Sequence, residues 1–263
     1  MNNFCVVTNS IKDPDLTFTK EVCAYIADNG RQFTTHPDKD TDCIIVLGGD
    51  GTVLQAAGDT LDLGIPLLGI NLGTLGYLAE IEKKEWKKAL QHVFADEYEI
   101  DSRMMLEGEH GGKKKFALND VVFARSGALR ILNYDIYVNG LYLNSFNADG
   151  IIFSTPTGST AYNLSAGGPI VEPGASLIVM TPICPHTLNS RSVVLSGNDK
   201  IEVQIGRTSN ESMLEAEVDF DGSGRISMKT GDRMRISKSD KVVRLLRLRR
   251  RSFLETLHRK MAD

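Results

Sequence analysis

A buried strand that ends abruptly in three glycines and one carboxylate is the feature that most constrains this chain. Residues 43–47 form a short apolar run, and it is followed directly by Gly48, Gly49, Asp50, Gly51 and Thr52. Glycines let the backbone approach a bound group closely, so the N–H groups of such a turn can point at anionic oxygens. A carboxylate beside a phosphate is costly unless it takes a proton, binds a cation or accepts a hydroxyl hydrogen bond. The residues alone leave two readings open, a phosphoryl-transfer site or an ordinary Asp-Gly turn.

The chain lacks the two commoner glycine-rich phosphate signatures. It contains no G-x-x-x-x-G-K-[ST] sequence, and no G-x-G-x-x-G follows an apolar run. Neither the lysine loop of the Walker type nor the usual dinucleotide fingerprint is therefore available. Any phosphate site here has to be built differently.

The first hundred residues alternate between strand-like and helix-like patterns. We expect strands at residues 4–8, 43–47 and 65–70, and helices at 15–29, 52–60 and 83–94. This order predicts a parallel, Rossmann-like sheet with crossover helices. Ligands on such sheets bind beyond the carboxyl ends of the strands, which is where Asp50 and residues 71–73 fall.

From about Tyr98 the pattern changes to short β-rich runs. They span residues 116–124, 132–138, 141–146, 151–154, 176–180, 200–205, 212–220 and 233–237. Asn139-Gly140 between two of these runs is a strong hairpin signal. A mostly antiparallel, sandwich-like β domain is the expected result. Residues 252–261 carry apolar side chains at helical spacing, which predicts a C-terminal helix that packs back on the first domain.

These patterns give three segments. We expect an α/β domain at residues 1–97 that carries the phosphate turn, a β-rich domain at 98–241, and a strand and helix at 242–263 that return to the first domain.

A second group of polar residues lies in the β-rich half. Residues 147–150 precede a strand and residues 154–169 follow it, and the latter are dense in hydroxyl groups and small side chains. Small residues let a ligand lie against backbone, hydroxyls supply hydrogen bonds, and Tyr162 offers a ring face suited to a purine or nicotinamide. Helix capping is the alternative for part of the set, with Ser159 as an N-cap and Gly167-Gly168 as a helix end.

Taken together, these segments resemble the bacterial NAD kinases. The resemblance rests on residues 48–52, Asn119-Asp120, Asp149-Gly150, residues 155–169 and residues 182–188, in the same order and spacing along nearly the whole chain. The long block from Thr155 is the most specific of these motifs. The resemblance implies the two-domain fold expected above.

It also implies an activity: transfer of the γ-phosphoryl of ATP to the 2′-hydroxyl of the adenosine ribose of NAD, giving NADP, with a divalent Mg or Mn ion. Asp50 is the implied base or orienting carboxylate, and the metal is expected to be held mainly by the ATP phosphates. The implied phosphate and ATP contacts are Gly48, Gly49, Gly51 and Thr52. The implied NAD contacts are Asp50, Gly51, Asn119, Asp120, Arg130, Asn147, Asp149, Thr160, Ala161, Tyr162, Asn163, Leu164, Ser165 and His186, with Asp221 and Ser223 as further candidates.

Three positions depart from the family pattern. Relatives more often carry Glu at Asp120, a basic residue at Asn147 and Gln at Ser223. Arg130 is a candidate to supply the missing charge, with an exposed strand arginine as the alternative. His186 is either a ligand contact or a structural histidine.

Composition fits two soluble domains. The chain has 263 residues, a net charge of −4, and no apolar run near the ~20 residues that cross a bilayer. No secretory signal is visible at the start, so we expect a cytoplasmic protein. The four cysteines, at positions 5, 23, 43 and 184, show no C-x-x-C spacing and are expected to be buried thiols.

The net charge gives no reason to expect nucleic acid as a partner, and the lack of a long apolar run gives none to expect a membrane. The arginines at 244, 247 and 249–251 form a local basic cluster, but in residues 242–248 apolar residues partly alternate with arginines, which favours a strand with a solvated face over a polyanion site. The resemblance implies a homodimer or homotetramer.

Two other functions compete. A lipid or sugar kinase could share the Gly-Gly-Asp-Gly turn, although the polar block from Thr155 suits a dinucleotide better than an acyl chain. A non-catalytic NAD(P) sensor would have little reason to set Asp50 against phosphates.

Overall fold

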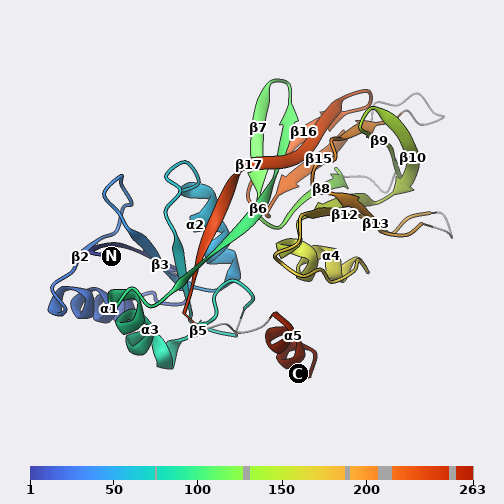
Figure 1. The fold of residues 1–263 in the computed structure, drawn as a ribbon. Helices are drawn as coiled ribbons and strands as arrows, with labels where there is room; N and C mark the ends of the chain where they lie inside the picture. Colours follow the sequence, from blue (N-terminus) through green and yellow to red (C-terminus); the bar gives the residue numbers. More distant parts are fainter. Residues whose placement is uncertain (75, 127–130, 187–189, 207–214, 249–252, 263) are drawn as a thin grey trace. The chain divides into compact units, whose positions relative to one another are not determined.

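The structure is a computed structural model that describes residues 1–74, 76–126, 131–186, 190–206, 215–248 and 253–262. The chain divides into two compact units (Figure 1). The first unit combines Met1–Arg103 with Val242–Asp263, and the second is Met104–Lys241.

The first unit is a parallel sheet with helices on both faces. Its strand order is β2-β1-β3-β4, and β5 and the end of β17 both pair with the free side of β4. The strands are Asn3–Thr8 (β1), Gln32–Thr34 (β2), Cys43–Gly48 (β3), Leu67–Asn71 (β4) and Ile81–Glu82 (β5). The helices are Thr17–Asp28 (α1), Asp50–Asp59 (α2), Trp86–Phe94 (α3) and Phe253–Ala262 (α5), with a 3-10 turn at Lys83–Glu85 (η1).

Hydrophobic patterning explains this arrangement. All residues of β3 are buried, as expected for a central parallel strand covered on both faces. Side chains of α1 and α3, including Val22 and Leu90, pack with alternate β3 residues such as Ile45 and Leu47. The α2 helix covers the other face (Figure 1).

Parallel pairing brings three loops to one edge of this sheet. Leu47 on β3 lies opposite Thr8 on β1 and Ile70 on β4. The loops that leave β1, β3 and β4 therefore begin side by side. Hydrogen bonds tie them together, from Asn9 N–H to Leu47 O at 2.9 Å and from Leu72 N–H to Gly48 O at 3.0 Å.

The second unit contains two antiparallel sheets. One has the order β13-β12-β11-β8-β15-β16; the other has β10-β9-β14-β17, with the β6–β7 hairpin paired to β17. The strands are Glu99–His110 (β6), Lys113–Ala117 (β7), Asp120–Arg125 (β8), Leu132–Val138 (β9), Leu141–Ala148 (β10), Gly150–Ser154 (β11), Leu177–Ile183 (β12), Val193–Ser196 (β13), Ile201–Ile205 (β14), Glu215–Phe220 (β15), Ile226–Lys229 (β16) and Arg233–Arg247 (β17). Two short helical segments, Thr157–Thr160 (η2) and Tyr162–Ser165 (α4), follow β11.

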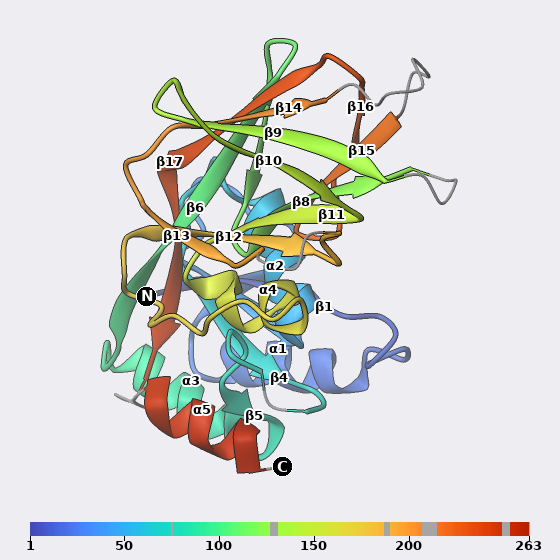
Figure 2. The ribbon, with the colours of Figure 1, turned by 90° about the vertical axis from the view of Figure 1, so that its right-hand side faces the viewer.

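The core of the second unit lies between its sheets. Phe123 and Phe153 from one sheet join Tyr134, Ile136 and Val203 from the other in a single buried cluster. Figure 2 shows β8, β11, β12 and β13 as one layer and β9, β10 and β14 as the other. The predicted order of an α/β domain, a sandwich-like β domain and a C-terminal helix is confirmed. The predicted limits at residues 97 and 241 stay a prediction.

Several local predictions also hold. Asn139 and Gly140 adopt φ of 52° and 81°, as the predicted tight hairpin between β9 and β10 requires. The C-terminal helix belongs to the first unit, where the ring of Phe253 lies 6.4 Å from that of Tyr77.

Four expectations need correction. The run 116–124 is two strands, since the chain turns at Leu118-Asn119. The run 233–237 continues as the long strand β17, and β6 was not predicted because its charged residues hide the alternation. Ser159 is not an N-cap, because η2 and α4 have no side-chain cap. Cys184 is exposed in the loop after β12, whereas the other three thiols are buried.

None of the helices in the described part of the chain is long and apolar enough to cross a membrane.

Candidate functional site

Main-chain amides hold the carboxylate of Asp50, the first residue of α2. Oδ2 accepts the N–H of Tyr77 at 2.8 Å, and Oδ1 accepts those of Leu78 and Ala79 at 3.0 Å each. A carboxylate offers about four lone-pair positions, so these bonds leave one position, on Oδ2. Asp50 can thus accept one further hydrogen bond while its orientation stays fixed.

Two residues of the loop after β4 make this clamp fit. A Cβ on Gly76 would overlap the Asp50 carboxylate, so a larger residue there would displace it. Buried Asn71 shapes the start of the loop, since its amide donates to Thr74 O and accepts the N–H of Gly73 at 2.8 Å. The clamp therefore depends on the sequence of the β4 loop as well as on the Gly-Asp-Gly turn.

The turn before α2 leaves amide groups free for an anion. Thr52 Oγ1 accepts the N–H of Gly49 at 3.4 Å and the side-chain amide of Asn9 at 3.1 Å. Gly48 has no room for a Cβ, which would overlap the Thr52 side chain. The N–H of Thr52 donates to Gly49 O at 3.0 Å, and the N-cap residue Gly49 has no side chain to occupy the other N–H groups of the first turn, so those groups can bind phosphate oxygens.

These groups surround an open pocket of about 450 Å³ in the first unit. It is lined by Asn9, Lys12, Gly49, Asp50, Gly51, Thr52, Gln55, Thr74, Gly76 and Lys260. Gly49, Asp50, Gly51 and Thr52 thus come together as predicted from the sequence, whereas Gly48 packs beneath them. The lining is polar, as a phosphate group would require.

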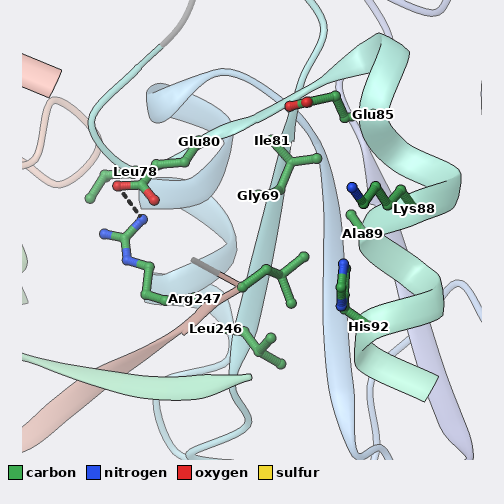
Figure 3. Close-up of a pocket in the computed structure, with 11 residues that line it drawn as sticks. Gly69, Leu78, Glu80, Ile81, Glu85, Lys88, Ala89, His92, Leu246 and Arg247 are labelled. Atoms are coloured by element: carbon green, nitrogen blue, oxygen red, sulfur yellow. Dashed lines mark ion pairs between the residues drawn. The ribbon is translucent and has the colours of Figure 1, made fainter. Parts of the chain in front are cut away.

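A second, more enclosed cavity lies between β4, α3 and the end of β17 (Figure 3). Arg247 pairs with Glu80 at 2.8 Å beside it. Its volume of about 40 Å³ suits only a few waters, and no predicted site residue lines it. The open pocket at Asp50 is therefore the better candidate site.

In the second unit, a buried carboxylate fixes the Asn119-Asp120 pair. Asp221 accepts the main-chain N–H groups of Leu118, Asn119 and Asp120 at 2.6, 2.8 and 3.1 Å. Burial raises the pKa of Asp221, and these hydrogen bonds oppose the shift. Asp221 itself has φ 54°. Its side chain acts as a brace for this turn.

Asp120 has a different environment. Its side chain is 6% exposed, and burial followed by the charges of Asp221 and Asp219 raises its pKa to about 7. Near neutral pH the group can hold or release a proton, so it can donate or accept a hydrogen bond.

The block after β11 is anchored to that pair. Thr155 Oγ1 donates to Leu118 O at 2.6 Å and accepts the N–H of Gly158 at 3.1 Å. A Cβ on Gly158 would overlap Asn119 O, so the two backbones touch directly.

Asn163 is a buried connector. Its amide donates to Ser159 O and Pro169 O, both at 3.0 Å, and accepts the Thr181 hydroxyl at 2.7 Å. The side chain is fully buried. This arrangement favours a positioning role, and direct ligand contact by Asn163 stays a prediction.

Other members of the block face outward. Tyr162 is 47% exposed, Leu164 and Ser165 are also exposed, and Thr160 and Ala161 are half-buried. They form a surface with an open aromatic ring and small neighbours.

Asn147 lies near the end of β10, and Asp149 lies between β10 and β11. Asp149 pairs with Arg125 Nε at 3.1 Å, and Asn147 Oδ1 accepts the amide of Asn133 at 3.1 Å. The N–H of His186 donates to Asn147 O at 2.9 Å, which brings the exposed His186 to this group.

Comparison with protein-family models decides the family. The ATP-NAD kinase N-terminal domain matches residues 5–98, and the ATP-NAD kinase C-terminal domain matches residues 118–248. The chain belongs to the NAD kinase family.

Individual relatives agree. NAD kinases of Lachnoclostridium phytofermentans and Lachnospira eligens are 44% and 42% identical, over 100% and 99% of this chain and the full length of each relative. Yeast NADH kinase, solved in complex with NADH, has a TM-score of 0.82 at 26% identity and is covered over 88% of its length by the whole of this chain. An NAD kinase from Archaeoglobus fulgidus, solved with ATP, has a TM-score of 0.81 at 24% identity over 99% of this chain and 98% of that one, and shows the same fold.

Membership of the NAD kinase family makes the chain a phosphotransferase, as predicted. Neither a lipid or sugar kinase nor a non-catalytic sensor is supported by these comparisons.

Some residues around the candidate site were not predicted from the sequence. Lys12, Lys260 and the Tyr77–Ala79 amides had not been predicted, nor had the Arg125 partner of Asp149. The rule that ligands bind at the carboxyl ends of parallel strands would have found Lys12, because it follows β1 as Asp50 follows β3. No sequence signal connects Lys260 to this pocket.

Two predicted contacts receive little support. Arg130 lies outside the described residues. Ser223 donates its hydroxyl to Phe220 O at 3.3 Å, within its own turn. Both contacts stay predictions.

The described residues contain no group of three His, Cys, Asp or Glu side chains that could hold a metal ion. Asp50 is the one carboxylate among the described residues that line the open pocket. Three main-chain amides already donate hydrogen bonds to its oxygens. This donor set fits a divalent ion that takes most of its ligands from nucleotide phosphates.

Proposed function

We propose that this chain transfers the γ-phosphoryl group of ATP to the 2′-hydroxyl of the adenosine ribose of NAD, giving NADP and ADP. Family membership supports this reaction. The assignment of Asp50 as the catalytic residue rests on its carboxylate, which main-chain amides hold at the phosphate pocket.

Asp50 is suited to act on the attacking hydroxyl. The open lone-pair position on Oδ2 accepts the hydroxyl proton as the oxygen forms its bond to the γ-phosphorus. The bond from that phosphorus to the bridging oxygen breaks, and ADP leaves. The amides of Tyr77, Leu78 and Ala79 keep the carboxylate aimed, so little reorganisation is needed.

The phosphate chain binds at the turn before α2. Gly49, Gly51 and Thr52 border it, and because the N–H groups of Gly49 and Thr52 are bonded within the turn, Gly51 is the one of the three that directs its N–H at the phosphate oxygens. A bound Mg or Mn ion would neutralise charge on the β- and γ-phosphates and would take most of its ligands from them.

NAD binds through residues of the second unit. Asn119 and Asp120 take ribose hydroxyls, and Tyr162 supplies a face for a base. The remaining proposed contacts are Arg130, Asn147, Asp149, Thr160, Ala161, Leu164, Ser165 and His186. Asp221, Thr155 and Asn163 hold the backbone beneath them.

The protein works in the cytoplasm as a homodimer or homotetramer. Strand β10 supports self-association, because it ends its sheet and exposes Leu141 at 75% and Tyr142 at 58%. Light scattering after size exclusion tests this: a monomer at every concentration would contradict it.

A coupled assay tests the reaction. Purified protein with Mg-ATP and NAD should form NADP, read with an NADP-specific dehydrogenase, and Asp50→Asn should lose most of the rate. Asp59→Asn is a matched control, because Asp59 is exposed at the other end of the same helix. Absence of NADP with ATP and with polyphosphate, from protein that binds NAD by calorimetry, would refute the proposed function.

A further inference from the structure

Lys12 sits in a loop that is fixed to the phosphate turn. Asn9 Oδ1 accepts the N–H groups of Ile11 and Lys12 at 3.0 and 3.2 Å, and the other end of its amide donates to Thr52 Oγ1. The loop after β1 is thereby held against the start of α2. These hydrogen bonds therefore fix the backbone of Lys12 beside the phosphate turn.

The ammonium of Lys12 occupies space that two glycines leave open. Nζ lies 3.1 Å from where a Cβ on Gly49 would stand and 3.0 Å from the corresponding point on Gly73. A side chain at either glycine would crowd the ammonium. The turns after β3 and β4 thus both make room for the same cation.

No acidic side chain in the described part of the chain forms an ion pair with Lys12. Among the described residues, no ion pair within 4.0 Å is found for Lys12, although the chain is acidic overall. The nearby carboxylate of Asp50 is already held by amides. An ammonium that lines a polar pocket of about 450 Å³ and forms no ion pair with the described acidic side chains is ready for an anionic ligand.

Lys260 brings a second ammonium to the same pocket. It comes from α5, and its Nζ lies 4.5 Å from the ring centroid of Tyr77, whose N–H binds Asp50. The cation–π contact accounts for part of its position. Two positive side chains and one clamped carboxylate are therefore the charged groups of the described lining.

We infer that Lys12 is the phosphate-binding lysine of this site and that Lys260 is an auxiliary contact from the C-terminal helix. The inference rests on the proposed function. Lys12 Nζ binds the outer oxygens of the phosphoryl donor's terminal phosphates, and it stabilises the charge that develops on them during transfer. It supplies the positive charge that a Walker lysine supplies in other phosphate loops, which this chain lacks.

Calorimetry with inorganic triphosphate tests the lysine without requiring turnover. Lys12→Gln should weaken binding about 10- to 100-fold, the range expected for loss of a charge-assisted hydrogen bond. Lys12→Arg should keep most of the affinity, and Lys260→Gln should lose less than Lys12→Gln. Lys39→Gln removes the same charge from an exposed lysine that does not line the pocket, and should bind like wild type.

Steady-state kinetics give the second readout. Lys12→Gln should raise the KM for ATP or lower kcat, with the KM for NAD within about twofold of wild type. Assays with ATP and with inorganic polyphosphate show which donor's phosphates the lysine serves.

The outcomes separate the two proposals. Triphosphate affinity of Lys12→Gln within about twofold of wild type would overturn the lysine assignment, even if wild type makes NADP. Lysine-dependent triphosphate binding by a protein that forms no NADP would support the lysine and refute the reaction.

Discussion

Replacing Asp50 by Asn should disturb the backbone as well as the chemistry. In the native carboxylate, Oδ1 accepts two amides and Oδ2 accepts one. An asparagine oxygen can keep the bonds from Leu78 and Ala79, but its NH₂ group then faces the N–H of Tyr77. Two charge-assisted bonds become neutral and a third becomes a contact between two donors, which together cost about 2–4 kcal/mol.

This cost should appear as local opening of the β4 loop. A loss of 2–4 kcal/mol corresponds to a rise of about 30- to 900-fold in the exchange rates of the Tyr77, Leu78 and Ala79 amides. Hydrogen–deuterium exchange of a peptide that spans the loop measures it, with Asp59→Asn as control. Unchanged exchange in Asp50→Asn would refute the clamp, and unchanged kcat would remove Asp50 from the mechanism.

Three further changes test the second unit. Tyr162→Ala should raise the Kd for NAD about 10-fold with little change in kcat, measured by calorimetry and steady-state kinetics; an effect on kcat alone would contradict the stacking role. Asp120 has a folded pKa raised to about 7 from an ordinary value of 3.8, so the folded state binds its proton more tightly and wild-type stability should fall as pH rises from 4 to 7. Asp120→Asn should therefore be more stable than wild type by about 1–4 kcal/mol at pH 8 in urea denaturation, with the difference disappearing near pH 4; a pH-independent difference would contradict the shift. Asn163→Ala should destabilise the second unit by about 2–4 kcal/mol, because it leaves the Ser159 and Pro169 carbonyls and the Thr181 hydroxyl without their partner; a melting temperature equal to wild type would show that these groups find others.

The fold of the first unit could be predicted from the sequence because the hydrophobic periodicity agrees with the burial observed there. The apolar run 43–47 is buried on both faces and ends at glycines, so strand, turn and helix start could all be predicted. In the second unit, the division at Leu118-Asn119 could not be predicted. It depends on the carboxylate of Asp221, about a hundred residues later, and no local pattern reports such a partner.

The site was predictable to the extent that its groups lie within motifs. The phosphate turn came directly from the Gly-Gly-Asp-Gly-Thr sequence, and four of its five residues line the pocket. The clamp on Asp50 was not foreseen, since it uses main-chain amides of Tyr77, Leu78 and Ala79, whose side chains carry no signal. Lys260 is also invisible locally, because only the fold brings the end of the chain to this pocket.

The block after β11 shows why a list of polar residues overstates ligand contacts. Thr155, Ser159 and Asn163 recur at every fourth position, and each uses its side chain to bind the backbone beneath it. Tyr162 and Leu164 lie between or beside them and face outward. Residues 156–158 are buried as well, and Tyr162 is the one exposed residue between Thr155 and Asn163, so the inner side of the segment is defined by these contacts and not by a spacing visible in the sequence. Many of the hydroxyl groups that indicated ligand recognition belong to side chains that hold the segment in place, and a smaller set of side chains faces outward. Substitutions in the inner set should therefore reduce stability before they change ligand affinity.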